Sequence, residues 1–306
     1  MVAIVGILVV FFAVIGGFLL EHGNLLLLIQ PSEILIIVGA AFGITIVANP
    51  TRVIRKIANS VRTVLRPEPL TSSILLRYLL MLYEVFGYGQ RAGVVALEEE
   101  VENPGNGRLF SRYPEFLKDA SLRDYLCDSL RMLVIGATTP VELDRLMGLD
   151  LDVQRRGAQE PSGALGALAD SLPGLGIVAA VLGVVITMSS IGAAPESIGQ
   201  KVAASLVGTF LGILLCYGVV GPFAARIEAN TEERMQLLEI VRTAVAAYAH
   251  GASPILAAEY ARRSIPTEMR PSFGEMEKVI RRDAKIPPVP DGSASGVKPP
   301  NAVAAA

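Results

Sequence analysis

The sequence contains few of the residues from which catalytic and metal sites are built. Its 306 residues include no Trp, two Cys and two His, and only 18% of them are charged. Neither Cys127 nor Cys216 has a metal-ligand neighbour, and two cysteines define no disulfide framework. His22 and His250 are isolated, and we expect ordinary solvated or hydrogen-bonded side chains for both. Walker A, GxSxG and HExxH motifs are absent, so the sequence predicts a protein that is not an enzyme and needs no cofactor or metal.

Charged residues are also missing from four long apolar segments. The segments are Met1–Leu20, Ile34–Ala48, Leu172–Ala194 and Val202–Ala225. A helix needs about 20 apolar residues to cross the hydrocarbon core of a bilayer, so the predicted fold class is an all-α membrane protein with four transmembrane helices. Met1–Leu20 lacks a basic start and a small-x-small cleavage site, which favours a retained helix over a signal peptide. Ile34–Ala48 is the shortest segment, and a re-entrant segment here would place the amino terminus outside.

Basic residues are unevenly placed and predict the orientation of these spans. Residues 1–50 contain no Lys or Arg, three basic residues closely follow the second segment, and Arg226 directly follows the fourth. Basic residues beside spans favour the cytoplasmic side, so both charged regions and both termini are predicted there. The loops Glu21–Glu33 and Pro195–Gln200 then face the opposite side. The formal net charge of −2 gives no indication of a nucleic-acid partner.

The polar regions have helical rather than strand periodicity. Leu122, Leu126, Leu130 and Leu133 recur at spacings of four, four and three, which places them on one helix face. Leu75–Phe86 is predicted as another helix. From residue 286 onward the chain is rich in Pro, Gly, Ser and Ala and is predicted to be disordered. The predicted domains are transmembrane helices 1 and 2 at 1–50, a cytoplasmic helical domain at 51–168, transmembrane helices 3 and 4 at 169–225, cytoplasmic C-terminal helices at 226–285 and the tail at 286–306.

Small residues line one face of each of the last two segments. They are Gly176, Ala180 and Gly183 in the third segment and Ala204, Gly208 and Gly212 in the fourth. Small side chains at this spacing let helices approach closely in a membrane. These faces therefore pack either within one subunit or against a partner helix. The hydroxyls of Thr187, Ser205 and Thr209 bond either across helices or back to their own helix.

Two prolines mark the cytoplasmic ends of the same segments. Pro173 is expected near the start of its helix, where a proline needs no special explanation. Pro222 removes a backbone donor inside a helix that continues, so a kink that can act as a hinge is predicted there.

No acidic residue is predicted at mid-membrane. Asp170 lies just before the third segment, and Glu33 lies just before the second. An ion carrier normally needs an ionisable group within the membrane. Another polypeptide would therefore have to supply the carboxylate if this chain handles ions.

Ordered sequence blocks along nearly the whole chain resemble one known family. The blocks are Gln30–Glu33, Leu97–Glu98 with Glu102–Pro104, Asp170–Pro173 with Gly176–Val181, Val207–Leu215 with Tyr217–Gly218 and Pro222, and Arg270–Phe273. In these blocks the chain resembles the MotA family, the stator subunits of the bacterial flagellar motor. The resemblance implies four spans in the bacterial inner membrane, with a large cytoplasmic loop between the second and the third.

The resemblance also implies partners and site residues. Family members form a pentamer around a dimer of MotB, whose membrane helix carries an ion-binding aspartate, and their cytoplasmic loops push on the rotor protein FliG. Carried over by position, the residues of the ion pathway and its coupling are Asp170, Pro173, Ala180, Thr209, Tyr217 and Pro222. Glu98 matches the acidic rotor contact, although Glu98–Glu100 also reads as a solvated acidic run. The basic contact falls on Gln90 or Arg91, because Gln90 stands where the family usually has arginine.

The resemblance also indicates which ion is conducted, and it leaves two alternative functions to be weighed. Sodium-type relatives place a threonine hydroxyl where this chain has Ala180, and sodium needs oxygen ligands, so the resemblance favours protons. One alternative function is an ExbB- or TolQ-like energiser of outer-membrane processes, but those relatives have three spans. The other is a passive membrane scaffold, which would need no arrangement of Pro173, Thr209 and Pro222.

Overall fold

The chain folds into helices that are joined by short turns. The computed structural model describes residues 2–65, 70–189, 192 and 194–288. No strand occurs among these residues, so the predicted helical class is confirmed for them. Residues 289–306, which make up most of the predicted disordered tail, lie outside the described residues.

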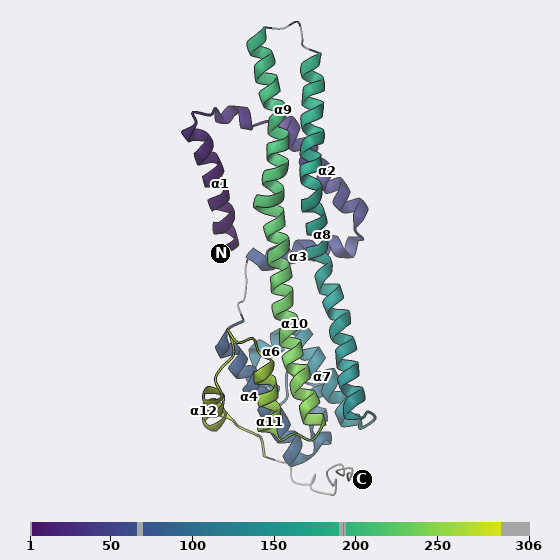
Figure 1. Cartoon of the computed structure of the whole chain (residues 1–306). Coiled ribbons are helices and arrows are strands. Elements are labelled where there is room, and N and C mark those ends of the chain that lie inside the picture. The colour runs from purple at the N-terminus through teal and green to yellow at the C-terminus, as the bar shows by residue number, and fades with distance from the viewer. Residues whose placement is uncertain (1, 66–69, 190–191, 193, 289–306) are drawn as a thin grey trace, which may run out of the picture. The chain divides into compact units, whose positions relative to one another are not determined.

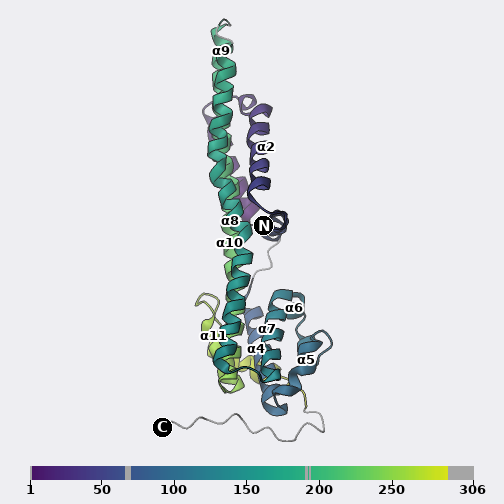
Figure 2. The same ribbon diagram turned by 90° about the vertical axis from the view of Figure 1, so that its right-hand side faces the viewer.

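The first of two compact units is formed by the described residues within 2–65 and 156–232. Its elements are α1 (Val2–Leu20), a 3-10 turn (Leu25–Leu28), α2 (Pro31–Ala48), α3 (Thr51–Leu65), the second part of α8 (Pro140–Met188), α9 (Pro195–Leu215) and the start of α10 (Gly221–Ala249). α8 and α9 run side by side, and α2 packs on α9 (Figures 1 and 2). A π-helical segment, Cys216–Val220, joins α9 to α10.

The second unit is formed by the described residues of 70–155 and 233–288. Its elements are α4 (Ser72–Ala92), α5 (Glu98–Glu102), α6 (Pro114–Lys118), α7 (Ala120–Ile135), α11 (Pro254–Ser264) and α12 (Phe273–Asp283), with the remaining parts of α8 and α10 and 3-10 turns at Val94–Leu97 and Phe110–Arg112. α11 and α12 both pack on α4, and α5 and α6 both pack on α7. The predicted helices around Leu75–Phe86 and Leu122–Leu133 are confirmed as parts of α4 and α7.

Three described helical stretches are long and apolar enough to cross a membrane. They are Leu25–Ala48, Pro140–Met188 and Ser197–Ala249. The apolar part of α1, Ile4–Leu20, is shorter. Length and composition therefore support three of the predicted spans, and the complete topology stays a prediction.

α8 differs from the sequence expectation because it is one continuous helix of 49 residues. The predicted domain boundary at residue 168 falls inside it, and Pro173 lies in its interior rather than near its start. The residues just before Pro173 are rich in Ala and Leu, which are strong helix formers, so they supply no stop signal. The predicted loop Pro195–Gln200 is also wrong, because α9 begins at Pro195, a first helical position that proline suits.

Glycines set the closest approach between α8 and α9. A Cβ atom on Gly176 would lie 2.7 Å from the carbonyl oxygen of Gly208. A Cβ atom on Gly212 would lie 2.6 Å from the carbonyl oxygen of Leu172. Both distances are too short for a carbon atom beside an oxygen, so any larger residue would force the helices apart. The two small-residue faces therefore pack against each other within one chain.

A fully buried carboxylate organises the second unit. Glu84 of α4 accepts hydrogen bonds from Arg112 Nη1 at 2.7 Å and from the Tyr113 hydroxyl at 2.8 Å. It also accepts the backbone N–H of Lys285 at 2.6 Å, which ties the segment after α12 to α4. Burial and the Glu84 carboxylate raise the pKa of Tyr113, so its hydroxyl keeps the proton that it donates. With three donors around it, the buried charge of Glu84 is satisfied.

A matched pair of glycine substitutions on α8 tests the helix contact. Gly174→Ala adds a methyl group where nothing lies within 4 Å, and alanine favours a helix over glycine by about 1 kcal/mol. The purified chain in detergent should then melt at the same or a higher temperature. Gly176→Ala gains the same propensity but overlaps the Gly208 carbonyl, so its melting temperature should fall. Circular dichroism measures both melting temperatures. If the two variants melt at the same temperature, the helix contact accommodates the added methyl group without loss of stability.

Candidate functional site

The predicted ion-pathway residues lie in the first unit, on or beside the α8–α9 pair. Asp170, Pro173 and Ala180 belong to α8, Thr209 to α9, Tyr217 to the π-helical segment and Pro222 to the first turn of α10. Asp170, Tyr217 and Pro222 are exposed in the single chain, whereas the other three are half-buried. The sequence prediction therefore selected residues of one region but of unequal accessibility.

The structure brings two of these residues to the same helix contact. A Cβ atom on Gly208 would lie 3.1 Å from the backbone nitrogen of Ala180. A Cβ atom on Gly176 would lie 3.2 Å from the Cα atom of Thr209. Ala180 and Thr209 thus both border the close approach of α8 and α9. The described contacts do not bring the exposed Asp170 to this point.

Large apolar side chains cover the outward faces of the same helices. They include Ile177, Val178, Val181, Leu182 and Val185 on α8, Val202, Leu206 and Ile213 on α9, and Tyr217 after it. Their exposed fractions run from 40% for Val202 to 74% for Tyr217. Contiguous apolar surface of this kind marks an interface with lipid or with another chain.

Two of the three candidate hydroxyls bond back to their own helix. Thr187 Oγ1 donates to the Gly183 oxygen at 2.9 Å, and Ser205 Oγ donates to the Lys201 oxygen at 2.9 Å. Both residues are buried, so these hydroxyls stabilise their helices locally. Thr209 is left as the half-buried hydroxyl beside the glycine contact.

The helix is irregular directly before Pro222. Cys216–Val220 is π-helical, and the Gly221 N–H donates to the Cys216 oxygen five residues earlier. A Cβ atom on Gly221 would lie 2.8 Å from that oxygen. π-helical segments are rare and occur frequently at functional sites. The sequence predicts a disturbed helix at Pro222, and the structure shows the disturbance as a wider turn on its N-terminal side.

Glu33 is a buried acid that sequence reasoning placed outside the second span. It lies in the first turn of α2, because this helix already begins at Pro31. The Glu33 side chain is only 6% exposed, and its Oε2 atom has no hydrogen-bond partner. Ile37 and Ala41 continue the same buried stripe at spacings of four. That spacing is the signal that would have found Glu33, since the acid occupies a core position of the helix.

The candidate rotor contacts lie in the second unit, on either side of a tight turn. Gln90 and Arg91 are exposed in the last turn of α4, and Glu98 is exposed at the first residue of α5. Gly93, at a φ of 87°, turns the chain between them in a conformation that favours glycine. Gln90 and Arg91 are both accessible, so exposure does not decide which of them makes the contact that the family assigns to a basic residue.

The acidic run that begins at Glu98 is not uniformly solvated. Glu98 and Glu99 are exposed, whereas Glu100 is buried. The Glu100 carboxylate accepts the backbone N–H of Arg108 at 2.6 Å and that of Leu109 at 3.0 Å. Glu100 therefore shapes the loop after α5, and only its two predecessors are free to face a partner.

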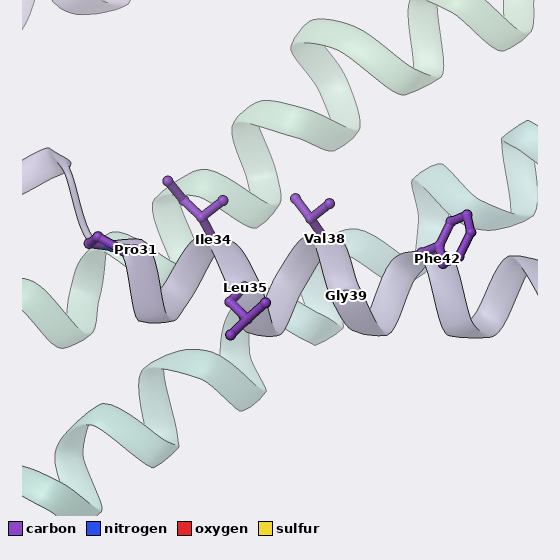
Figure 3. Close-up of a pocket in the computed structure, with 6 residues that line it drawn as sticks. All are labelled: Pro31, Ile34, Leu35, Val38, Gly39 and Phe42. Atoms are coloured by element: carbon purple, nitrogen blue, oxygen red, sulfur yellow. The ribbon is translucent and has the colours of Figure 1, made fainter.

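A shallow apolar hollow of about 590 Å³ lies along α2 (Figure 3). Its lining residues are Pro31, Ile34, Leu35, Val38, Gly39 and Phe42. None of these side chains titrates or offers an oxygen ligand, so the hollow has no ion-binding chemistry. Among the residues that the structure describes, no group of three or more His, Cys, Asp or Glu is placed to hold a metal.

Comparison with known proteins gives the family. The profile described as Motility protein A N-terminal matches residues 4–93, and that of the MotA/TolQ/ExbB proton channel family matches residues 117–240. Motility protein A of Salmonella typhimurium is 34% identical over 92% of this chain and 95% of its own length. Motility protein A of Escherichia coli has the same values. Chemotaxis protein LafT of Vibrio parahaemolyticus is 32% identical over 89% of this chain and 96% of its own length.

Two solved structures share the fold. The MotAB structure of C. jejuni has a TM-score of 0.73 at 18% identity and covers 89% of this chain and 98% of that chain. The flagellar MotAB stator complex from Bacillus subtilis has a TM-score of 0.71 at 22% identity, with 88% and 98% covered. These two structures show the shared fold, whereas the profile matches and the 34% identity show the family. The chain belongs to the MotA family, the stator subunits of the bacterial flagellar motor within the MotA/TolQ/ExbB proton channel family, and it is not an enzyme.

Proposed function

We propose that this chain, with a MotB partner, forms the unit that conducts protons and generates torque in the flagellar motor. The observation that carries the proposal is the exposed apolar face of α8 and α9. Leu172–Met188 and Val202–Ala225 contain no Asp, Glu, Lys or Arg. A proton path needs an ionisable group within the membrane, and this face has none. We infer that the membrane helix of MotB packs here and supplies an aspartate.

The proposed assembly has four spans per chain, both termini in the cytoplasm, and five chains around a MotB dimer. Arg52 and Lys56 of α3 support this orientation, because basic residues beside a span favour the cytoplasmic side. They pair with Glu160 of α8 at 3.3 Å and 2.8 Å. The solved relatives are described as MotAB complexes, which supports the partner. The second unit would then lie in the cytoplasm, within reach of FliG.

Proton flux with and without the partner tests the central proposal. Proteoliposomes that hold this chain with MotB should conduct protons. The chain alone, or with MotB whose membrane aspartate is changed to asparagine, should conduct little, because the apolar face has no proton acceptor. The flux should not change when external sodium replaces potassium at fixed pH, since Ala180 has no hydroxyl to bind sodium. Robust flux from the chain alone, or a steep dependence on sodium, would contradict the proposal.

We assign the rotor contact to Glu98, with Gln90 or Arg91 as the basic side. All three residues are exposed around the turn at Gly93. An exposed ion pair contributes about 0–1 kcal/mol, so several such contacts must act together in each step. Repulsion introduced at one contact should therefore have a larger effect than the loss of one attraction.

Charge reversal at Glu98 tests this assignment. Glu98→Lys should reduce swimming speed more than Glu98→Ala, and an opposite charge reversal on FliG should partly restore it. Glu99→Lys is the matched control, because Glu99 is the next residue of α5 and is also exposed. It should have a milder effect in the same swimming assay. Normal swimming of Glu98→Lys cells, or an equal loss in Glu99→Lys cells, would remove the assignment.

We assign the coupling between proton transfer and movement to Pro173 and Pro222. Pro173 removes a backbone N–H from the interior of α8, and Pro222 removes one from the first turn of α10. A charge change on the partner's aspartate acts strongly in low-dielectric surroundings. Because α10 runs on from Gly221 to Ala249, a bend at Pro222 would be transmitted along that helix.

Restoring the missing backbone donor tests the coupling role. Pro222→Ala allows a complete and stiffer helix, so torque per stator in a bead assay should fall while co-purification with MotB stays intact. Unchanged torque would eliminate the hinge. Lost co-purification would instead indicate that Pro222 serves helix packing.

A further inference from the structure

The segment that follows α12 contacts α4 just before the candidate rotor contacts. The backbone N–H of Lys285 donates to Glu84 Oε1 at 2.6 Å. The next residue, Ile286, lies against Gly87, because a Cβ atom on Gly87 would be 2.5 Å from Ile286 Cδ1. We call residues 284–288 the strap, since they join the end of α12 to α4.

Arg112 fastens the strap a second time. Its Nη1 atom donates to Glu84 Oε2 at 2.7 Å and to the backbone oxygen of Lys285 at 2.9 Å. The Glu84 side chain is fully buried. A buried carboxylate that loses one of its donors is strongly destabilised, so Glu84 and the strap hold each other in place.

The strap lies on the face of α4 that continues to Arg91. Glu84, Gly87 and Arg91 follow one another at spacings of three and four, which places them on one helix face. Gln90 precedes Arg91 by one residue and lies about 100° around the helix from it. The two strap contacts therefore approach the exposed last turn of α4 along the side of Arg91.

The same end of α4 is held from its other side by apolar groups of the second unit. A Cβ atom on Gly89 would lie 2.8 Å from the Tyr248 hydroxyl and 3.0 Å from Leu97 Cδ1. Gly89 is two residues from Gly87 and so points about 200° away from it. Leu97 directly precedes Glu98, so the start of α5 rests on this end of α4 as well.

We propose that the strap is a positioning element for the rotor contacts, which fixes how the last turn of α4 presents Gln90 and Arg91. The inference rests on the proposed function, from which it takes these contacts and Glu98. Exposed ion pairs are weak, so they add up only when their charges are aligned. Helix ends fray, and the strap holds α4 one turn before its end.

Two substitutions at one position test the backbone bond of the strap. Lys285→Pro removes the N–H that Glu84 accepts and keeps the oxygen that Arg112 binds. Ala284, at φ −64° and ψ 125°, already has the extended backbone that a following proline requires. Loss of a hydrogen bond to a buried charge should open the strap about 10- to 100-fold more often. Amide hydrogen exchange in the last two turns of α4 should rise accordingly, and torque in a bead assay should fall.

The matched control is Lys285→Ala, which removes the same side chain but keeps the N–H. Its hydrogen exchange and torque should equal those of the unaltered chain. Co-purification with MotB and proton flux into liposomes should be unchanged in both variants, because the strap contacts lie in the second unit.

Combination with rotor-contact substitutions shows whether the strap acts through those contacts. Gln90→Ala together with Arg91→Ala removes both candidates for the basic side and should reduce torque. Adding Lys285→Pro to this pair should reduce torque no further, since a contact that is already lost cannot be misaligned. A strap that only stabilises the fold would instead give an additional loss of torque.

The outcomes separate this inference from the proposed function. Normal torque or lost proton flux with Lys285→Pro, or an additional loss in the combined variant, would overturn the positioning role alone. Should Lys285→Pro fail to co-purify with MotB, Ile286→Ala decides, because it removes the atom that lies on Gly87 and keeps both backbone bonds; normal torque would then overturn the role. Full torque with Gln90→Ala and Arg91→Ala together would overturn the rotor assignment, and the positioning role with it.

Discussion

The backbone contact between α8 and α9 is the constraint on which the rest of the first unit depends. Helices in a bilayer gain little from hiding apolar surface, because lipid is as apolar as a leucine side chain, so close van der Waals packing must hold them together. Gly176, Gly208 and Gly212 allow that packing by leaving no atoms between the backbones. The large side chains are consequently directed outward, which creates the exposed apolar face. The same glycine at 208 leaves the space that the Glu33 carboxyl occupies.

Much of the helical architecture could be predicted, because it follows from local periodicity and from the thickness of a bilayer. The leucines from Leu122 to Leu133 recur at helical spacing, and α7 covers all of them. Helix ends were less predictable. Pro173 reads as a start signal, but the strong helix formers before it carry α8 through that position. Pro195 reads as part of a loop, although its fixed φ suits the first turn of α9.

The candidate site residues were selected by sequence similarity, and their surroundings were less predictable where backbone hydrogen bonds decide the local structure. Ala180 and Thr209 were selected by resemblance, and the structure places both at the glycine contact. The π-helical turn before Pro222 depends on a bonding register that hydropathy does not report. Glu100 belongs to an acidic run that suggests solvent, yet two backbone N–H groups hold it inside. Glu33 was missed because an average over an apolar segment hides the face on which one acid falls.

The hydrogen bond from Lys285 to Glu84 has a consequence for how the end of the chain evolves. Glu84 accepts the main-chain N–H of Lys285, and Arg112 donates to the main-chain oxygen of the same residue at 2.9 Å. Neither bond involves the lysine side chain, so any residue except proline can keep both. Position 285 is therefore anchored by its backbone while its identity is free to drift. The backbone bonds at Lys285 therefore fix the end of the second unit on α4 regardless of the side chain at this position.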